Sequence, residues 1–254
     1  MNRFPAAVLF DLDDTLFDHR HASHAALQAI HAQHAQQTDF TAFAQQHAHV
    51  LETYHRRFLH GELTLDEARA ARMIKLFEAF GYALTPEQSL QIGALYRQHH
   101  LANRQLVKGA YELLEALRGR VKLAIITNNS VAEQLEKLRY LGIAHFFEAI
   151  VISEDVGFTK PDRRIFELAL ERLGVSASQA VMIGDNWAAD IEGAHAAGIA
   201  TVWLNRNLET QALARLAGHN AVEKRAGIGD SVAIEIAALH PARAVMESIH
   251  RILW

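Results

Sequence analysis

Two closely spaced carboxylates stand near the N-terminus, in the segment Asp11-Leu12-Asp13-Asp14-Thr15. The apolar run before them, residues 6–10, predicts a short buried strand because it is bulky and too short for a helix. Side chains two apart share one face of a strand, so Asp11 and Asp13 are expected to converge beyond its end. Their repulsion would be offset by a divalent cation such as Mg²⁺, which prefers oxygen ligands. The pair also suits nucleophilic attack by one acid and proton transfer by the other. By itself, the segment is equally compatible with a polar loop that caps a helix.

Two further segments combine a predicted strand end with groups that bind anions. Thr127 and Asn128 follow the predicted strand 121–126. The Thr127 hydroxyl and the Asn128 backbone N–H lie near a helix N-terminus, which favours an anion. Lys160 precedes Pro161 at the start of a helix, where its ammonium could neutralise phosphate oxygens and hold a nucleophilic carboxylate ionised. Most lysines lie on the protein surface, so Lys160 supports an anion-binding site only in combination with the other segments.

The fourth segment, Gly184 to Asp190, follows the predicted strand 180–183. Gly184 permits a tight turn and a close approach of the backbone. Asp185 is expected to supply a metal carboxylate opposite Asp11. Asp190 has two interpretations, as a partner of a metal-bound water or a lysine, or as a favourable charge at a helix N-terminus.

These segments need a folded core to hold them in place. Strands and helices alternate from about residue 106. Predicted helices cover 109–117, 131–141, 162–173 and 187–197, and predicted strands cover 121–126, 149–152, 180–183 and 200–204. This rhythm predicts an α/β, Rossmann-like core, a parallel sheet with helices on both faces. Ligands bind at the carboxyl ends of such strands, where all four segments fall. The pattern weakens after Asn205, where we predict a helix over 208–216, a loop over 218–229, a strand over 231–236 and a helix over 241–253.

Residues 17–104 contain no convincing strand, and their apolar positions recur at helical spacing. Thr64 with Glu67, and Thr85 with Pro86, mark helix starts. We predict an inserted all-helical domain of four or five helices over 17–104, with 1–16 and 105–254 forming the core domain. Many of the sixteen histidines lie in this insertion. We favour solvated helix faces over a metal site for them, because no H-E-x-x-H pattern accompanies them.

Composition excludes several classes of function. The 254 residues carry a net charge of −4 and no cysteine, and half of them are hydrophobic. Disulfides and cysteine nucleophiles are therefore excluded, and bulk binding to nucleic acid or to a membrane is not expected. No apolar stretch is long enough to span a bilayer, and the N-terminal residues lead directly into the first strand without a signal peptide. We expect a cytoplasmic protein.

The four segments together resemble the motifs of the haloacid dehalogenase-like (HAD) hydrolase superfamily, in the same order. They read D-L-D-D-T at 11–15, I-T-N-N at 126–129, K-P at 160–161 and G-D-N-W-A-A-D at 184–190. The helical insertion resembles the small helical cap of that superfamily. The stretches V-I-S-E-D-V-G-F-T-K-P and G-I-A-T-V-W-L-N are similar to the phosphatase branch with pyrimidine 5′-nucleotidases and N-acylneuraminate-9-phosphatases.

The resemblance implies a role for each motif residue. Asp11 is the expected nucleophile and Asp13 the acid and base, with Thr127 and Lys160 as further catalytic groups. The expected Mg²⁺ site uses Asp11, Asp13, Asp185 and Asp190. Substrate binding is assigned to Thr15, Phe17, Thr127, Asn128 and Lys160.

The implied function is Mg²⁺-dependent hydrolysis of a small phosphate monoester, through an aspartyl-phosphate intermediate. A nucleoside monophosphate or a sugar phosphate would suit such a site. A phosphomutase, a 2-haloacid dehalogenase and a non-catalytic metal-binding module are the alternatives. Asp13 favours phosphoryl transfer over dehalogenation, because dehalogenases of this kind lack an acid two residues after the nucleophile. The sequence predicts no oligomeric state.

Overall fold

The computed structural model describes residues 5–206, 225–228 and 231–252. The chain divides into two compact units, one of Met1–Asp18 with Leu106–Trp254 and one of His19–Gln105. The first boundary falls two residues after the position expected from the sequence, and the second falls one residue after it.

The first unit is built on a seven-stranded sheet with the order β3-β2-β1-β4-β5-β7-β6. Neighbouring strands are parallel except for β6 and β7, which pair antiparallel at one edge. The prediction of a parallel α/β sheet is therefore confirmed. The strands are β1 (Ala7–Phe10), β2 (Lys122–Thr127), β3 (Ala149–Ile152), β4 (Ala180–Gly184), β5 (Ala200–Leu204), β6 (Arg225–Ile228) and β7 (Ser231–Ile236).

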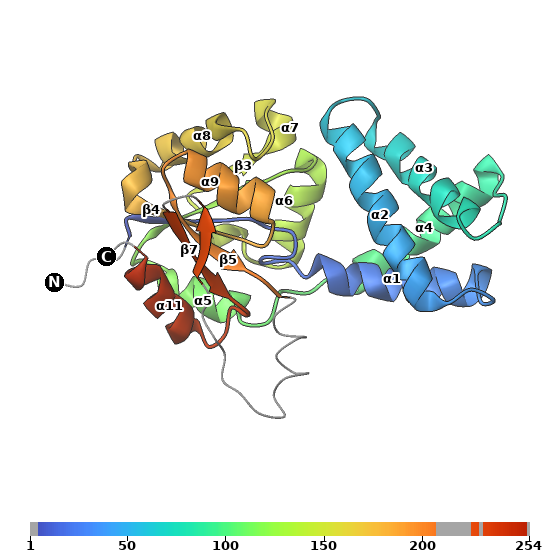
Figure 1. Ribbon diagram of the computed structural model, residues 1–254, viewed down its shortest axis with the longest axis horizontal. Helices are drawn as coiled ribbons and strands as arrows, with labels where there is room; N and C mark the ends of the chain where they lie inside the picture. Colours follow the sequence, from blue (N-terminus) through green and yellow to red (C-terminus); the bar gives the residue numbers. More distant parts are fainter. Residues whose placement is uncertain (1–4, 207–224, 229–230, 253–254) are drawn as a thin grey trace. The chain divides into compact units, whose positions relative to one another are not determined.

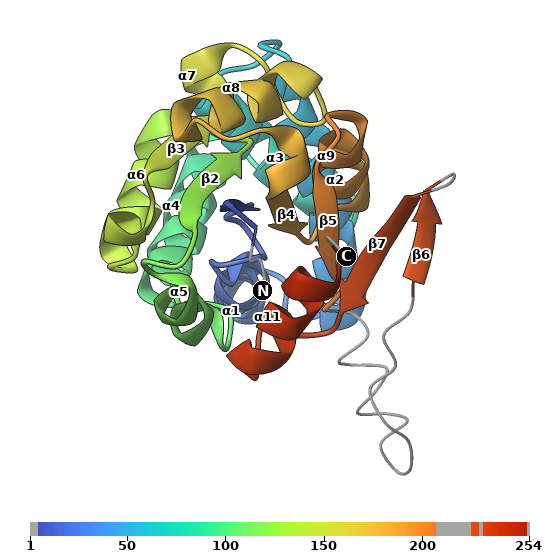
Figure 2. The ribbon, with the colours of Figure 1, turned by 90° about the vertical axis from the view of Figure 1, so that its left-hand side faces the viewer.

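Helices cover both faces of this sheet, as predicted. In Figure 2, α8 and α9 lie on one side of the strands, and α5 and α11 lie on the other. None of the helices in the described ranges is long and apolar enough to cross a membrane. The helices of this unit are α5 (Ala110–Leu117), α6 (Val131–Tyr140), α7 (Ser153–Val156), α8 (Arg163–Leu173), α9 (Gly193–Ala196) and α11 (Ala242–Arg251), with short turns η1 (Ala144–Phe146), η2 (Ala177–Gln179) and η3 (Trp187–Glu192).

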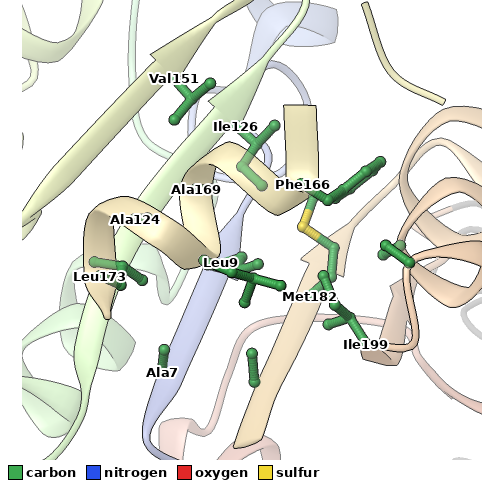
Figure 3. Packing of buried hydrophobic residues seen from close by; sticks show 14 of the residues in the cluster. Ala7, Leu9, Ala124, Ile126, Val151, Phe166, Ala169, Leu173, Met182 and Ile199 are labelled. Carbon is green, nitrogen blue, oxygen red and sulfur yellow. The ribbon is translucent and has the colours of Figure 1, made fainter. Parts of the chain in front are cut away.

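The core under α8 shows why the strands are so apolar. Leu9 of β1 aligns with Ala124 of β2 and with Met182 of β4, so the three side chains share one face of the sheet. Phe166 and Ala169 of α8 pack onto that face, and all five residues are fully buried (Figure 3). Strands buried on both faces are apolar along most of their length, so the polar residues of the predicted motifs lie at or beyond the strand ends.

Three predictions for the first unit differ from the structure or lie outside the described residues. The predicted helix 187–197 begins as a π-helix, η3, before α9 continues it. The predicted loop 218–229 is wrong for 225–228, which form the edge strand β6. A four-residue edge strand pairs on one side only and leaves little apolar signal. The predicted helix 208–216 lies outside the described residues.

The second unit contains four helices in its described residues, drawn in blue to teal in Figure 1. They are α1 (His19–His34), α2 (Phe40–Leu59), α3 (Leu65–Glu78) and α4 (Pro86–Ala102). Thr64 with Glu67 and Thr85 with Gln88 form reciprocal capping boxes, which confirms both predicted helix starts. Helix α1 packs against α4 and α2 against α3, around a core that includes Phe43. The chain therefore carries a separate helical core between β1 and β2.

Candidate active site

The site lies at the carboxyl ends of β1, β2 and β4. Asp11 directly follows β1, and its backbone N–H donates to the Ile183 carbonyl across a distance of 3.0 Å. This bond extends the pairing of β1 with β4 by one residue and fixes the backbone of Asp11. Thr127 is the last residue of β2, and Gly184 is the last residue of β4. The sheet order places β1 between β2 and β4, so the three predicted motifs meet at one edge.

Lys160 is the central cation of the site. Its ammonium donates to Asp11 Oδ1 at 2.7 Å and to Asp190 Oδ1 at 2.6 Å. All three residues are buried. Asp11 and Asp190 are 179 positions apart in sequence, but both accept a hydrogen bond from the Lys160 ammonium. Of the two interpretations of Asp190, the structure shows the lysine partner.

The Asn128 side chain fixes the backbone of Lys160. Its amide Nδ2 donates to the Lys160 carbonyl at 2.9 Å, and its Oδ1 accepts from the Lys160 N–H at 2.8 Å. These two bonds join the loop after β2 to the loop before α8. Asn128 therefore positions the lysine through its side chain, a contact that the sequence did not indicate. Its predicted backbone contact with an anion stays a prediction.

Burial and charge set the electrostatics of this cluster. Burial raises the pKa of Asp11 to about 7, Asp190 and Asp13 add to the rise, and the ammonium of Lys160 opposes it. Burial alone would lower the pKa of Lys160, but Asp11 and Asp190 together outweigh it and raise the value. The rise in the pKa of Asp11 comes mainly from burial, and the rise in the pKa of Lys160 comes from the two carboxylates that face it. The cluster is thus short of positive charge, and a bound cation would favour the ionised form of Asp11.

The close approach of Asp190 to the backbone requires glycine at position 184. A Cβ at Gly184 would lie 2.3 Å from Asp190 Oδ2 and 2.5 Å from its Cβ and Cγ. Asp190 Oδ2 also accepts the Asn186 N–H at 3.0 Å, and the Asp190 N–H donates to the Asn186 carbonyl. The π-helical turn carries these contacts, which aim the carboxylate back toward Lys160.

Three carboxylates form a candidate metal site. Ligand atoms of Asp11, Asp185 and Asp190 all lie within 4.8 Å of one another. Asp185 is half-buried, and Trp203 Nε1 donates to its backbone carbonyl at 2.9 Å. The donor set consists of hard oxygens, which suit Mg²⁺. Within the described residues, no histidine of the helical unit joins such a group.

Asp13 is held by two residues of α6 that the sequence analysis did not identify. Lys137 Nζ donates to both carboxylate oxygens, at 2.6 and 2.8 Å. Gln134 Nε2 donates to Asp13 Oδ2 at 3.0 Å and to Thr127 Oγ1 at 2.6 Å. A signal was present, because Gln134 precedes the buried Leu138 by one helical turn and so lies on the apolar face of α6.

Two predicted substrate-binding residues are enclosed by the core unit. Thr15 is fully buried, and its hydroxyl has no hydrogen-bond partner among the described residues. Phe17 is fully buried as well, and the Lys137 ammonium lies 5.1 Å from its ring centroid. The substrate contacts assigned to Thr15 and Phe17 stay predictions.

The loop after β1 is fastened to the end of β5 by an arginine. Arg206 Nη1 lies 3.3 Å from Asp14 Oδ1, and its Nη2 lies 2.9 Å from Asp18 Oδ1. Asp14 has a positive φ of 61°, an uncommon conformation outside glycine. The two ion pairs brace this unusual turn, which follows the acidic pair directly. Arg206 was also not identified from the sequence, because no motif surrounds it.

The chain is similar to proteins of one hydrolase family. The family model described as haloacid dehalogenase-like hydrolase matches residues 5–198. The HAD-hydrolase YfnB of Bacillus subtilis is 33% identical over 207 residues, which cover 80% of this chain and 85% of that protein. A crystal structure of YfnB bound to magnesium superposes with a TM-score of 0.74 and 28% identity, and it covers 96% of this chain and 100% of that one.

Two further relatives have names that specify a substrate. The ribulose-1,5-bisphosphate 5-phosphatase of Halopiger xanaduensis is 33% identical over 210 residues, which cover 81% of this chain and 87% of that protein. The pyrimidine 5′-nucleotidase PynA of Streptococcus pneumoniae is 31% identical over 201 residues, which cover 78% and 83%. The similarity therefore extends over most of each chain.

Proposed function

The chain belongs to the haloacid dehalogenase-like hydrolase family, and we propose that it is a Mg²⁺-dependent phosphate monoester hydrolase. The observation that carries the proposal is the pairing of buried Lys160 with both Asp11 and Asp190, beside Asp185. A carboxylate nucleophile, a fixed cation and a further acid for a metal are the groups that phosphoryl transfer requires.

The acids fit Mg²⁺. The Asp11 and Asp185 carboxylates and the Asp13 backbone carbonyl would hold the ion. Asp190 lies beside them, and both of its oxygens already accept hydrogen bonds, from Lys160 and from the Asn186 N–H. Bound Mg²⁺ would offset the negative charge of the acids and of the transferring phosphoryl group.

The reaction proceeds in two displacements at phosphorus. An Asp11 carboxylate oxygen attacks, the bond from phosphorus to the ester oxygen breaks, and Asp13 gives a proton to the departing oxygen. Water then attacks the aspartyl-phosphate, the bond from phosphorus to Asp11 breaks, and Asp13 takes a proton from that water. The second step restores the Asp11 carboxylate and the protonated Asp13, and it releases inorganic phosphate.

The phosphoryl oxygens need donors that are already in place. The Thr127 hydroxyl, the Asn128 backbone N–H and the Lys160 ammonium supply them at the ends of neighbouring loops. Asn128 holds Lys160 by two hydrogen bonds, so little reorganisation is needed when charge develops. We assign the helical unit to the role of a cap that excludes water and contacts the leaving group.

The substrate is a small phosphorylated metabolite, and a nucleoside monophosphate is our first candidate. The names of the relatives include a pyrimidine 5′-nucleotidase and a sugar-bisphosphate phosphatase, which supports a small ester. The test is a screen of nucleoside monophosphates and sugar phosphates with the purified protein, with Mg²⁺ and after chelation. Phosphate release is expected only with Mg²⁺.

Asp11→Asn is the matched variant for the nucleophile. It keeps the size of the side chain but removes the attacking oxygen, so turnover should fall by at least about a thousandfold. Asp66→Asn in α3 is the control, because that carboxylate is exposed and should not affect turnover. Near-normal phosphate release by Asp11→Asn would contradict the proposal, as would halide release from a 2-haloacid without any phosphatase activity.

A further inference from the structure

Helix α6 presents two buried polar residues to the acidic pair of the core. Gln134 and Lys137 lie three residues apart, so their side chains project from the same side of the helix. Gln134 is fully buried and Lys137 is 6% exposed. Removing a lysine and an amide from water is costly, and it is sustained only when partners replace the water. Asp13 and Thr127 are the partners of the Lys137 ammonium and of Gln134 Nε2, whereas Gln134 Oε1 has no hydrogen-bond partner among the described residues.

Three N–H donors converge on the Asp13 carboxylate. Lys137 bridges both oxygens, and Gln134 adds a bond to Oδ2. A carboxylate can accept about four hydrogen bonds, so these contacts fix its plane while leaving it able to meet another group. The Lys137 ammonium is itself held over the ring of Phe17. Asp13 therefore has little rotational freedom before any ligand arrives.

Gln134 also determines what the Thr127 hydroxyl can do. Its single Nε2 group donates to Thr127 Oγ1 at 2.6 Å and to Asp13 Oδ2. Because Thr127 Oγ1 accepts this bond, its own proton is left to donate elsewhere. One amide thus couples the orientation of the acid to the direction in which the hydroxyl donates.

We propose that Gln134 and Lys137 form a positioning pair, which aims Asp13 at the leaving-group oxygen and the Thr127 hydroxyl at a phosphoryl oxygen. This inference rests on the proposed function and extends it to residues outside the four motifs. A misplacement of an acid by an ångström is enough to slow proton transfer strongly.

The choice of leaving group separates positioning from general destabilisation. An alkyl phosphate, such as a nucleoside monophosphate or a sugar phosphate, expels an alkoxide that needs a proton from Asp13. p-Nitrophenyl phosphate expels a stable phenolate that needs little proton transfer. Because kcat/KM reports the steps up to departure of the leaving group, a fall in the ratio of its alkyl to aryl values between wild type and variant reports a loss of acid function.

The variants are Lys137→Met, Lys137→Arg and Gln134→Leu, with Arg139→Met as the control. Arg139 is an exposed cation on the same helix, and its Nε donates to the Leu135 carbonyl. For Lys137→Met, the alkyl-to-aryl ratio should fall at least about tenfold, within the range of general acid catalysis. Gln134→Leu should lower it at least about threefold, Lys137→Arg should restore most of it, and Arg139→Met should leave it unchanged.

The outcomes distinguish failure of the positioning pair from failure of the proposed phosphatase function. Equal loss on both esters, or an unchanged ratio in Lys137→Met and Gln134→Leu, would overturn the positioning pair alone. A wild-type protein that hydrolyses no ester with Mg²⁺ would overturn the proposed function, and the pair with it. Circular dichroism of each variant identifies misfolding, and Lys137→Arg and Gln134→Leu keep the test decisive if Lys137→Met is unfolded.

Discussion

The two units bury polar groups in opposite ways. In the core unit, Lys160 is buried between Asp11 and Asp190, and its ammonium contacts both carboxylates. In the helical unit, His47 is 2% exposed, and its Nε2 has no hydrogen-bond partner among the described residues. The groups that act on His47 electrostatically include Arg72, which has the charge that a protonated imidazole would carry.

The difference shows what each unit must keep buried. The core unit retains charge, because opposite charges within hydrogen-bonding distance offset part of the cost of removal from water. In the helical unit, the buried imidazole of His47 is kept neutral. Burial first, then Arg72, His19 and His100, lower the pKa of His47 well below its usual value. The buried charge of Lys160 lies at the candidate active site, whereas the neutral His47 lies in the helical unit. Each contrast can be tested by a matched pair of substitutions.

The largest effect is expected for Lys160→Met. The variant leaves two buried carboxylates without their cation, so the free energy of unfolding should fall by about 3–5 kcal/mol. Phosphatase turnover should fall at least about a hundredfold. Urea unfolding and initial rates measure the two effects. The control is Lys75→Met in α3, whose exposed pair with Glu78 should leave the unfolding midpoint unchanged. Equal responses of the two variants would remove the distinction between the units.

A pair of glycine substitutions should have opposite signs. Gly184→Ala places a Cβ into the Asp190 carboxylate, so we expect a loss of about 1–3 kcal/mol and slower turnover. Gly93→Ala in α4 meets only Met73 Cγ at 3.9 Å and should stabilise the helix by about 0.5–1 kcal/mol. Thermal unfolding of both variants tests this. Stabilisation by Gly184→Ala would show that Asp190 can move away at little cost.

The smallest effect concerns pH. Because the pKa of His47 is lowered on folding, the unfolded chain binds more protons, and stability should fall as the pH drops below about 6.5. The slope from one histidine is at most about 1.4 kcal/mol per pH unit. His47→Leu should flatten that slope while changing stability at pH 7.5 little. Urea unfolding at pH 7.5 and 5.5, followed at 222 nm, provides the measurement. An unchanged slope in His47→Leu would show that a group other than His47 causes the pH dependence of stability.

The sequence by itself was sufficient for features that depend on short-range spacing. The short, continuously apolar strands, the capping boxes at Thr64 and Thr85, and the carboxylates after β1 follow from short-range sequence patterns. The order of the four motifs then indicated the family and the edge of the sheet where they meet. Strand β6 was missed because a short edge strand carries little local signal.

Only the tertiary structure decided which groups pair. Asp11 and Lys160 are 149 positions apart, and Asp13 and Lys137 are 124 apart. Such contacts depend on strand order, register and helix rotation, which no local pattern encodes. The side-chain role of Asn128 and the pairing of Gln134 with both Thr127 and Asp13 were therefore visible only after folding. Local periodicity fixes where a side chain can project, but packing over the whole sheet determines what it meets.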